Sequence, residues 1–250
     1  MAHPGRLNMK EFINSKEKKQ LYVNQMFSKI APRYDLVTAL LSYGQDRRWK
    51  KKLVQWTDVQ PHHTILDLAC GTGDITFMLA KMVSTGRVVG VDITPGMIEI
   101  ASRKKQQLGI NGIEFEVGDI TRLEFHANTF DRITVGYGVR NVPDIACLLS
   151  EVFRMLKPGG RFLSLDFAKP VNPFYCRAYL CYLTLMGSLL GWVMHRDPDV
   201  YRYISESLKL YPAQHGVQIL MDKAGFEDTG YLVCGGGIIA INYGRKPAAP

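Results

Sequence analysis

The chain has 250 residues, of which 46% are hydrophobic, and this suits one large globular domain or one domain with an insertion. The net charge of +8 indicates an acidic partner surface, either anionic lipid or nucleic acid. The five cysteines are scattered without a C-x-x-C pair, which argues against a disulfide framework or a zinc site, and we expect neither a secretory leader nor a run of about 20 apolar residues that spans a membrane.

The first 60 residues are predicted to be mainly helical. We expect a loose arm at residues 1–9 and a helix from Lys10 to Ile30, because apolar residues recur there at helical spacing and Pro32 follows. A second helix is predicted from Val37 toward Trp56. It carries a basic run made of Arg47, Arg48, Lys50, Lys51 and Lys52. Most such runs are solvated helix faces, and the alternative is contact with lipid headgroups or nucleic acid.

Residues 64–74, T-I-L-D-L-A-C-G-T-G-D, predict a buried strand, a glycine turn and the start of a helix. Gly71 and Gly73 allow the backbone to turn sharply and to approach a ligand. The third glycine of the dinucleotide fingerprint is missing, and so is the Lys-Ser/Thr pair of a P-loop. Asp67 and Asp74 flank the turn and would repel a pyrophosphate. The segment therefore predicts a binding loop for a ligand without phosphates.

A second apolar strand, residues 88–92, ends in another acid, Asp92. A carboxylate at this position can accept hydrogen bonds from two ribose hydroxyls. A ligand with a ribose, an ammonium and a sulfonium but no phosphate is S-adenosylmethionine, which we expect as the cofactor. A structural turn with incidental acids is the alternative, and the spacing of two strand-end carboxylates around the G-T-G turn disfavours it.

Strands and helices alternate from residue 64 onward. Strands are predicted at 64–69, 87–92, 113–118, 130–136 and 160–167, and helices at 74–84, 95–109 and 144–157. This alternation favours a doubly wound parallel sheet. Right-handed crossovers then place Asp67, Asp92 and Asp119 at one edge, where such sheets bind ligands. The chain closes with a helix near 213–224 and strands near 226–233 and 237–244.

Residues 168–212 interrupt the alternation. The run from Ala178 to Met194 carries no charge, but it is short for a membrane span. A buried core helix is the default interpretation. The alternative is a lid helix that covers an apolar substrate or rests on a membrane.

Short motifs occur along the chain in a set order. They are Y-D at 34–35, L-S-Y-G at 41–44, W-K at 49–50, G-T-G-D at 71–74, F-D at 130–131, Y-G-V-R-N-V at 137–142, R-M-L-K-P-G-G at 154–160, Y-R-Y at 201–203, E-S at 206–207 with Pro212, and G-G-I at 236–238. In this combination, from about Phe27 to Lys246, the sequence resembles the UbiE family of ubiquinone/menaquinone C-methyltransferases.

The resemblance implies an α/β fold of the class I S-adenosylmethionine-dependent methyltransferases: a doubly wound, mostly parallel seven-stranded sheet with a C-terminal antiparallel hairpin. It implies an N-terminal helical segment at 1–60 and a methyltransferase domain at 61–250, with a helical lid insertion at 168–212. It also implies methyl transfer to a ring carbon of a polyprenylated quinol. The predicted cofactor-binding residues are Asp67, Gly71, Thr72, Gly73, Asp92, Ile93, Asp119, Ile120 and Gly136.

Several residues depart from the family motifs. The serine that precedes the family's F-G-L-R-N is Gly136 here, so that side-chain contact with the cofactor is absent. The histidine three residues before the tryptophan is Asp46. Other departures are Val37 and Thr38 for Met-Asn, Asp166 for the glutamate of L-E-F, and Asn242 for a histidine in the last strand. These positions leave open whether the acceptor is a benzoquinol or a naphthoquinol, and how long its prenyl chain is.

A quinol carbon becomes nucleophilic when its ring oxygen loses a proton, and a phenol has a pKa of about 10. The enzyme must therefore stabilise a phenolate or supply a base. Arg140, Asn141 and Tyr34 are the predicted catalytic residues, with Arg140 beside one ring oxygen and Asn141 beside the other. In the alternative, Arg140 pairs with a carboxylate and holds the lid. His195 and Asp166 are weaker candidates for the base.

Three other functions compete with this one. Asn172-Pro173-Phe174-Tyr175 is similar to the N-P-P-Y box of amino-group methyltransferases, but it follows the fifth strand instead of the fourth, so methylation of nucleic acid is disfavoured. A methyltransferase for another phenolic ring and a non-catalytic scaffold in quinone synthesis remain open. We expect a cytoplasmic protein whose partners are a lipophilic quinol and the anionic inner face of the membrane. A homodimer is compatible with the sequence.

Overall fold

The computed structural model describes residues 16–248, so the predicted arm at 1–9 and the predicted helix start at Lys10 lie outside the described residues. The elements in chain order are α2 (Lys16–Ile30), α3 (Tyr34–Leu41), α4 (Asp46–Trp56), β1 (Thr64–Leu68), α5 (Asp74–Ala80), β2 (Arg87–Asp92), α6 (Pro95–Leu108), β3 (Ile113–Val117), β4 (Phe130–Gly136), α7 (Ile145–Met155), β5 (Leu156–Phe167), α8 (Pro173–His195), α9 (Asp199–Leu210), α10 (Ala213–Lys223), β6 (Glu227–Cys234) and β7 (Ile239–Arg245). Short 3-10 turns occupy Ala31–Arg33, Val139–Asn141 and Gly235–Gly237.

The strands form one seven-stranded sheet in the order β3-β2-β1-β4-β5-β7-β6. The first five are parallel, and β7 runs antiparallel to both β5 and β6. The predicted doubly wound sheet with its C-terminal hairpin is confirmed. Chain order reverses between β1 and β4, so a crevice opens beyond their carboxyl ends, which is where such sheets bind ligands.

The start of β5 differs from the prediction. A helix was predicted to reach residue 157 and the strand to begin at 160, but β5 already begins at Leu156, which pairs with Phe130. The register shifts before Arg132 pairs with Arg161, and Gly159 has a φ of 76°. Residues 157–160 therefore form an irregularity within the strand.

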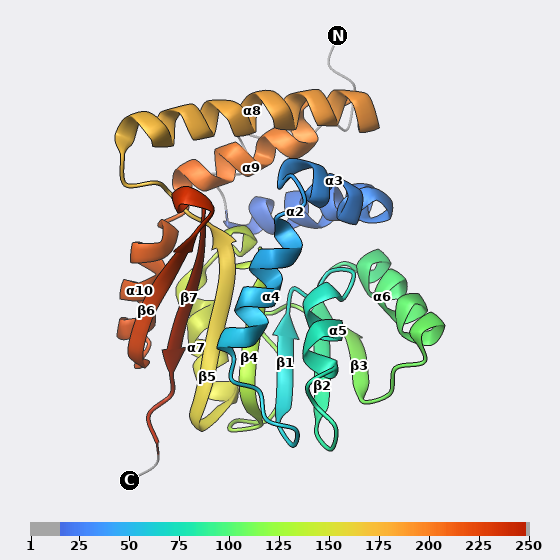
Figure 1. Ribbon diagram of the computed structural model, residues 1–250, viewed down its shortest axis with the longest axis vertical. Helices are drawn as coiled ribbons and strands as arrows, with labels where there is room; N and C mark the ends of the chain where they lie inside the picture. The colour runs from blue at the N-terminus through green and yellow to red at the C-terminus, as the bar shows by residue number, and fades with distance from the viewer. Residues whose placement is uncertain (1–15, 249–250) are drawn as a thin grey trace.

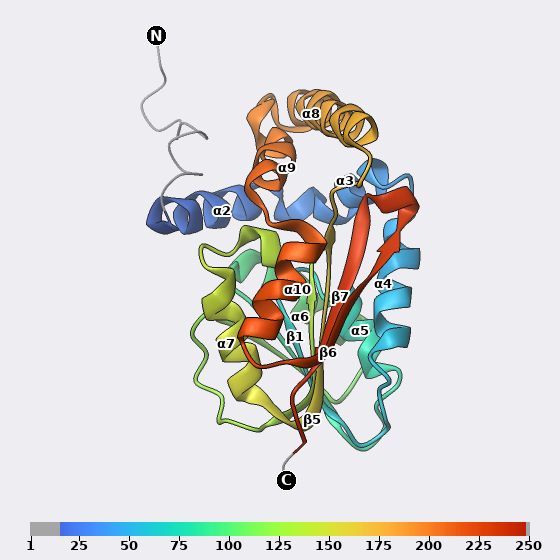
Figure 2. The same cartoon turned by 90° about the vertical axis from the view of Figure 1, so that its left-hand side faces the viewer.

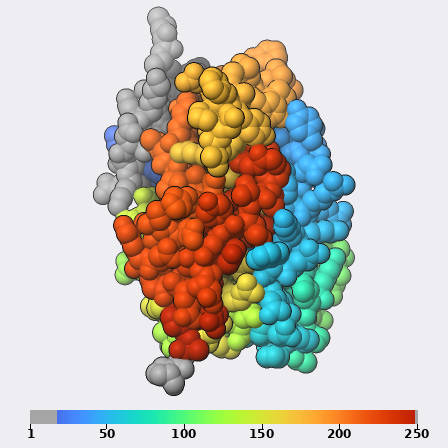
Figure 3. All heavy atoms as spheres, turned by 60° about the vertical axis from the view of Figure 1, so that its left-hand side comes forward, coloured from blue at the N-terminus to red at the C-terminus, as the bar shows by residue number. Residues whose placement is uncertain are grey.

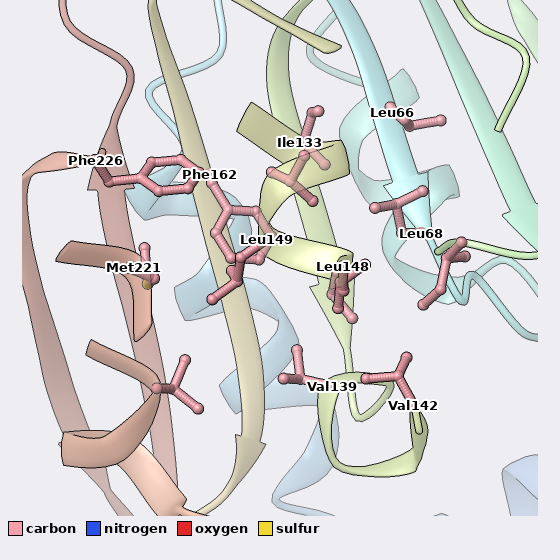
Figure 4. Packing of buried hydrophobic residues seen from close by; sticks show 14 of the residues in the cluster. Leu66, Leu68, Ile133, Val139, Val142, Leu148, Leu149, Phe162, Met221 and Phe226 are labelled. Atoms are coloured by element: carbon pink, nitrogen blue, oxygen red, sulfur yellow. The ribbon is translucent and has the colours of Figure 1, made fainter. Parts of the chain in front are cut away.

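The sheet is buried between two layers of helices (Figure 2). Alternate residues of the strands point to opposite faces. Leu66 and Ile133 pack with α7 and α10, and Ile65 and Leu163 pack with α4 and α5. Figure 4 shows the first of these clusters, in which Leu148 and Leu149 lie against the strands. This core fixes the positions of the strand ends.

Four helices, α2, α3, α8 and α9, form a cap over the carboxyl edge of the sheet (Figure 1). The helix predicted from Val37 to Trp56 is in fact two helices, because Tyr43 and Gly44 adopt positive φ values of 49° and 72°. As a result α3 belongs to the cap, while α4 packs on the sheet. The described part of the N-terminal segment thus contributes to both the cap and the sheet layer.

Helices α8 and α9 lie against each other at the outer side of the cap. Glycines make this close approach possible: a Cβ at Gly187 would lie 2.8 Å from the Tyr201 carbonyl oxygen, and one at Gly191 would lie 2.5 Å from the Asp197 carbonyl oxygen. The buried-core interpretation of this segment is wrong. Among the described residues, α8 is a 23-residue helix long and apolar enough to cross a membrane, yet only 22% of its most apolar window is buried.

Candidate active site

The glycine loop turns directly after β1. Gly71 and Gly73 have φ values of 55° and 89°, in the left-handed region that side chains disfavour. A Cβ at Gly73 would lie 2.8 Å from the Phe77 ring, so the loop has no room for a larger residue there. Gly71 donates its backbone N–H to Asp92 Oδ2 at 2.9 Å, and the N–H of Thr94 donates to Asp92 Oδ1 at 2.8 Å. These bonds fix the Asp92 carboxylate at the edge of the sheet.

A narrow crevice follows the ends of β1, β2 and β4. Six predicted cofactor-binding residues line it: Gly71, Asp92, Ile93, Asp119, Ile120 and Gly136. The crevice measures only about 70 Å³, because Val23 and Phe27 of α2 lie across it. Ligand pockets are usually larger, roughly 300–1,000 Å³. We therefore expect α2 to move outward when a cofactor binds.

Three predicted cofactor-binding residues do not line the crevice. Asp67 is fully buried, and its two oxygens accept hydrogen bonds from Thr134 at 2.7 Å and Thr76 at 2.6 Å. Burial raises the pKa of Asp67 to about 6. Thr72 donates to Asp35 Oδ1 at 2.7 Å, which ties the glycine loop to α3. Asp67, Thr72 and Gly73 thus support the conformation of the glycine loop without lining the crevice.

The crevice fits the expected cofactor chemically. Asn141 lines it, and its Oδ1 atom is buried without a hydrogen-bond partner in the described part of the chain. Its Nδ2 donates to the Tyr137 carbonyl oxygen at 3.1 Å. The Oδ1 atom of Asn141 can therefore accept a hydrogen bond from an ammonium or a hydroxyl group of a ligand. Asn141 was predicted to hold a ring oxygen of the acceptor; it lines the crevice, and its contact with the acceptor stays a prediction.

A second, larger space lies inside the cap. It has a volume of about 550 Å³, and most of its lining is aliphatic or aromatic. Its walls come from α2, α3, α8, α9 and the turn before β7, including Met26, Val37, Leu183 and Ile238. Tyr43 and Tyr182, whose rings stack with centroids 6.3 Å apart, join the end of α3 to α8 on one side of this cavity. The cap cavity is suited to a lipid-like molecule.

The crevice and the cap cavity meet at Phe27, Tyr34 and Tyr137, which line both. Burial raises the pKa of Tyr34 to about 12, so its hydroxyl stays protonated at neutral pH. Tyr34, a predicted catalytic residue, therefore lies where the two spaces meet, and its catalytic role stays a prediction. A methyl group that passes from one space to the other must pass these aromatic rings.

Arg140 lies at the inner wall of the cap cavity and is 5% exposed. Its Nη1 binds Asp166 Oδ1 at 2.5 Å, its backbone N–H donates to Asp166 Oδ2 at 3.0 Å, and its Nε donates to Ser207 of α9 at 2.9 Å. The guanidinium also stacks over Phe167, 4.7 Å from the ring centroid. Arg140 therefore holds the cap to the sheet edge, as the alternative predicted, while it also faces the cavity.

A charged cluster around the buried Lys50 was missed in the sequence. Lys50 binds Asp46 Oδ2 at 2.7 Å and Asp74 Oδ2 at 3.0 Å. The i,i+4 spacing of Asp46 and Lys50 was a usable signal. The basic run is thus divided: Lys50 is buried, while Arg47, Arg48 and Lys51 are exposed.

The other candidates have structural partners. Asn172 caps α8 by accepting the N–H groups of Phe174 and Tyr175, which accounts for the box-like sequence without amino-group chemistry. His195 Nε2 lies 2.9 Å from the Tyr201 hydroxyl at the far end of α8. Asp166 pairs with Arg140.

Comparison with known proteins agrees with this site. Residues 13–246 match the model of the ubiE/COQ5 methyltransferase family. The chain belongs to this family. It is 37% identical to the ubiquinone/menaquinone biosynthesis C-methyltransferase UbiE of Salmonella arizonae and 38% identical to that of Klebsiella pneumoniae, in each case over 93% of both chains.

Solved structures share the fold at low identity. A SAM dependent methyltransferase from Aquifex aeolicus has a TM-score of 0.61 and 18% identity, over 84% of this chain and 97% of that one. A possible histamine N-methyltransferase from Thermotoga maritima has a TM-score of 0.62 and 19% identity, over 89% and 99%. This member of the ubiE/COQ5 family is an S-adenosylmethionine-dependent methyltransferase.

Proposed function

We propose that this enzyme methylates a ring carbon of a polyprenylated quinol in ubiquinone or menaquinone biosynthesis. The observation that carries the proposal is the apolar cap cavity of about 550 Å³, which meets the cofactor crevice at Tyr34 and Tyr137. A prenylated ring needs an apolar pocket beside the methyl donor. The names of the curated relatives point to the same class of acceptor.

The residues of the site suit this reaction. When bound, S-adenosylmethionine supplies an electrophilic methyl group. Asp92, Asp119 and Asn141 would hold its ribose and amino groups at the strand edge. Two nitrogens of the Arg140 guanidinium are bound to Asp166 and Ser207, and Nη2 is left without a partner among the described residues. Nη2 would donate to the developing phenolate oxygen and favour its ionised form.

The dry cavity also favours the transfer, because cation and phenolate neutralise each other and a water-poor site does not oppose that change.

A different phenolic acceptor is the second candidate, since Val37 and Thr38, which depart from the family motif, line the cap cavity. The effect of prenyl-chain length on KM distinguishes these two candidate functions. We expect KM to fall by about tenfold or more when two prenyl units are added to the ring, because each buried CH2 contributes about 0.8 kcal/mol. Equal KM values for prenylated and bare rings would favour the other phenol.

Peripheral membrane binding at the cytoplasmic face is part of the proposal. A stripe at helical spacing along the outside of α8 is exposed: Phe174, Cys181, Leu185, Leu189 and Trp192. Leu36 and Leu40 of α3 are also exposed, near the cap cavity. Figure 3 shows α8 on the outer surface of the cap. Resting this stripe on a bilayer would let a lipid-like acceptor reach the cavity without crossing water.

The basic residues support binding to anionic lipid. Arg177 and Arg196 are exposed at the two ends of α8. We expect co-sedimentation with vesicles of phosphatidylcholine and phosphatidylglycerol at low salt, and weaker binding to phosphatidylcholine alone. Leu185→Glu with Trp192→Glu should reduce binding by about tenfold or more. Leu108→Glu at the exposed end of α6 is the matched control. If the double variant and the Leu108→Glu control bind the vesicles equally, the membrane contact lies elsewhere on the protein.

A further inference from the structure

Asp46 carries a buried carboxylate oxygen that the fold does not satisfy. The residue is 8% exposed, and its Oδ2 binds Lys50 at 2.7 Å. Its Oδ1 has no hydrogen-bond partner among the described residues. Buried polar atoms nearly always have partners, so an unpaired carboxylate oxygen indicates a functional role.

The side chain of Tyr137 interacts with the Asp46 carboxylate. Burial and the nearby Asp46 carboxylate raise the pKa of Tyr137 well above its usual range. Tyr137 has a φ of 58°, a strained value for a bulky residue, and this conformation places its ring between the crevice and the cap cavity. The Tyr137 ring packs on Phe167 with centroids 5.6 Å apart, which fixes its direction.

Asp46 also reaches solvent on its other side. It lines an open polar groove between α3, α4 and α5, together with Arg47, Lys51 and Asp74. The charged and titratable groups around it include Arg47, Lys50 and Lys51 of α4, Tyr34 and Asp35 of α3, Asp74 of α5, Lys81 after α5 and Tyr137 after β4. The Asp46 carboxylate therefore lies between the reaction space and bulk water.

We propose that Tyr137 and Asp46 form the route by which the acceptor's proton leaves the cap cavity, an inference that rests on the proposed quinol methylation. The ring hydroxyl passes its proton to the Tyr137 oxygen as the Tyr137 proton moves to Asp46 Oδ1, and Asp46 releases it to water in the groove. Tyr137 stays neutral throughout, and Lys50 holds the carboxylate in place. Tyr137 is the catalytic residue, and Asp46 acts through it as a positioning residue.

The proton balance requires such an exit. Each transfer breaks the bond between sulfur and methyl, forms a bond between the ring carbon and methyl, and turns a sulfonium into a neutral thioether. The ring carbon then gives up its hydrogen as the ring oxygen is reprotonated, so one proton leaves per turnover.

The test uses Tyr137→Phe and Asp46→Asn in the full chain. Their matched controls are Tyr231→Phe on β6 and Asp58→Asn beyond the other end of α4. Methyl transfer to a reduced short-chain demethylmenaquinone is measured at saturating acceptor from pH 6 to pH 10, and cofactor affinity by calorimetry. We expect kcat near pH 7 to fall about 100-fold in each variant, with cofactor affinity unchanged. The double variant should lose no more than either single one.

The pH profile separates a proton route from a merely structural role. The loss should shrink toward pH 10, because the ring hydroxyl then ionises without help. A loss of the same size at every pH, or no loss in either variant, would overturn the route while leaving the proposed function intact. Absence of transfer by the unaltered enzyme would overturn the proposed function, and this route with it.

Discussion

The cofactor crevice and the cap cavity are adjacent but are built in different ways. The crevice comes from the ends of neighbouring parallel strands, with polar backbone and fixed carboxylates such as Asp92. The cap cavity comes from two pairs of consecutive helices, α2–α3 and α8–α9, and the turn before β7, which lie far apart in the sequence, and mostly apolar side chains line it. A charged ligand needs groups at exact places on a rigid sheet, while a lipid-like ligand needs shape, which helices can supply by packing.

Removal of Arg140 should have the largest effect, because this residue lines the cap cavity and holds the cap to the sheet edge. Arg140→Ala leaves Asp166 buried without its partner, which should lower the free energy of unfolding by about 3–5 kcal/mol. Methyl transfer should fall by about 100-fold or more, since the phenolate loses its donor. Urea unfolding and labelled transfer measure the two effects.

Arg140→Lys is the matched control for charge. The lysine keeps a positive charge beside Asp166. Its ammonium group, however, cannot bind Asp166, Ser207 and the phenolate oxygen at the same time. We expect part of the stability to return while transfer stays low and cofactor affinity is unchanged. If transfer survives intact in Arg140→Ala, Arg140 only holds the cap.

The second prediction concerns Asp67, beneath the crevice. Its pKa is raised by burial from 3.8 to about 6, so the folded state takes up a proton where the unfolded state does not. Stability should therefore decrease as pH rises from about 4 to about 7, by roughly 3 kcal/mol from this group. The measurement is the difference in unfolding free energy between wild type and Asp67→Asn at each pH, which should change by that amount.

The same variant sharpens the comparison between the two regions. Asp67 is held by Thr76 and Thr134 and does not line the crevice. Cofactor affinity should accordingly change little in Asp67→Asn once the protein is folded. A large loss of affinity with unchanged stability would mean that Asp67 contacts the cofactor, as the sequence predicts.

The smallest predicted effect concerns Gly136, where the family motif has a serine. A Cβ at Gly136 would lie 2.3 Å from Ile75 Cδ1, so Gly136→Ser should lower the free energy of unfolding by about 1–3 kcal/mol. Ile75→Val removes that methyl group, and the double variant should recover most of the loss. Thermal unfolding of the two single variants and the double variant measures this. Full stability of Gly136→Ser alone would show that the crevice wall is more adaptable than the geometry indicates.

The sequence allowed the crevice to be predicted because its signals are local. A glycine turn and an acid after each strand specify the sheet edge, and six of the nine predicted cofactor residues line the crevice. The cavity could not be predicted in this way, because Met26, Val37 and Leu183 meet only through tertiary packing. The break at Tyr43 was missed, and the exposure of α8 was left as one of two alternatives, for the same reason. Neither helix propensity nor apolar content indicates the surface against which an apolar helix will pack.

The most direct test of the account is methyl transfer from labelled S-adenosylmethionine to a short-chain demethylmenaquinone, with and without a reductant. We expect label in the ring only under reducing conditions, because only the quinol can form the nucleophilic phenolate. Label without reductant, or no label while the cofactor binds, would contradict quinol C-methylation and would direct the search to other phenols.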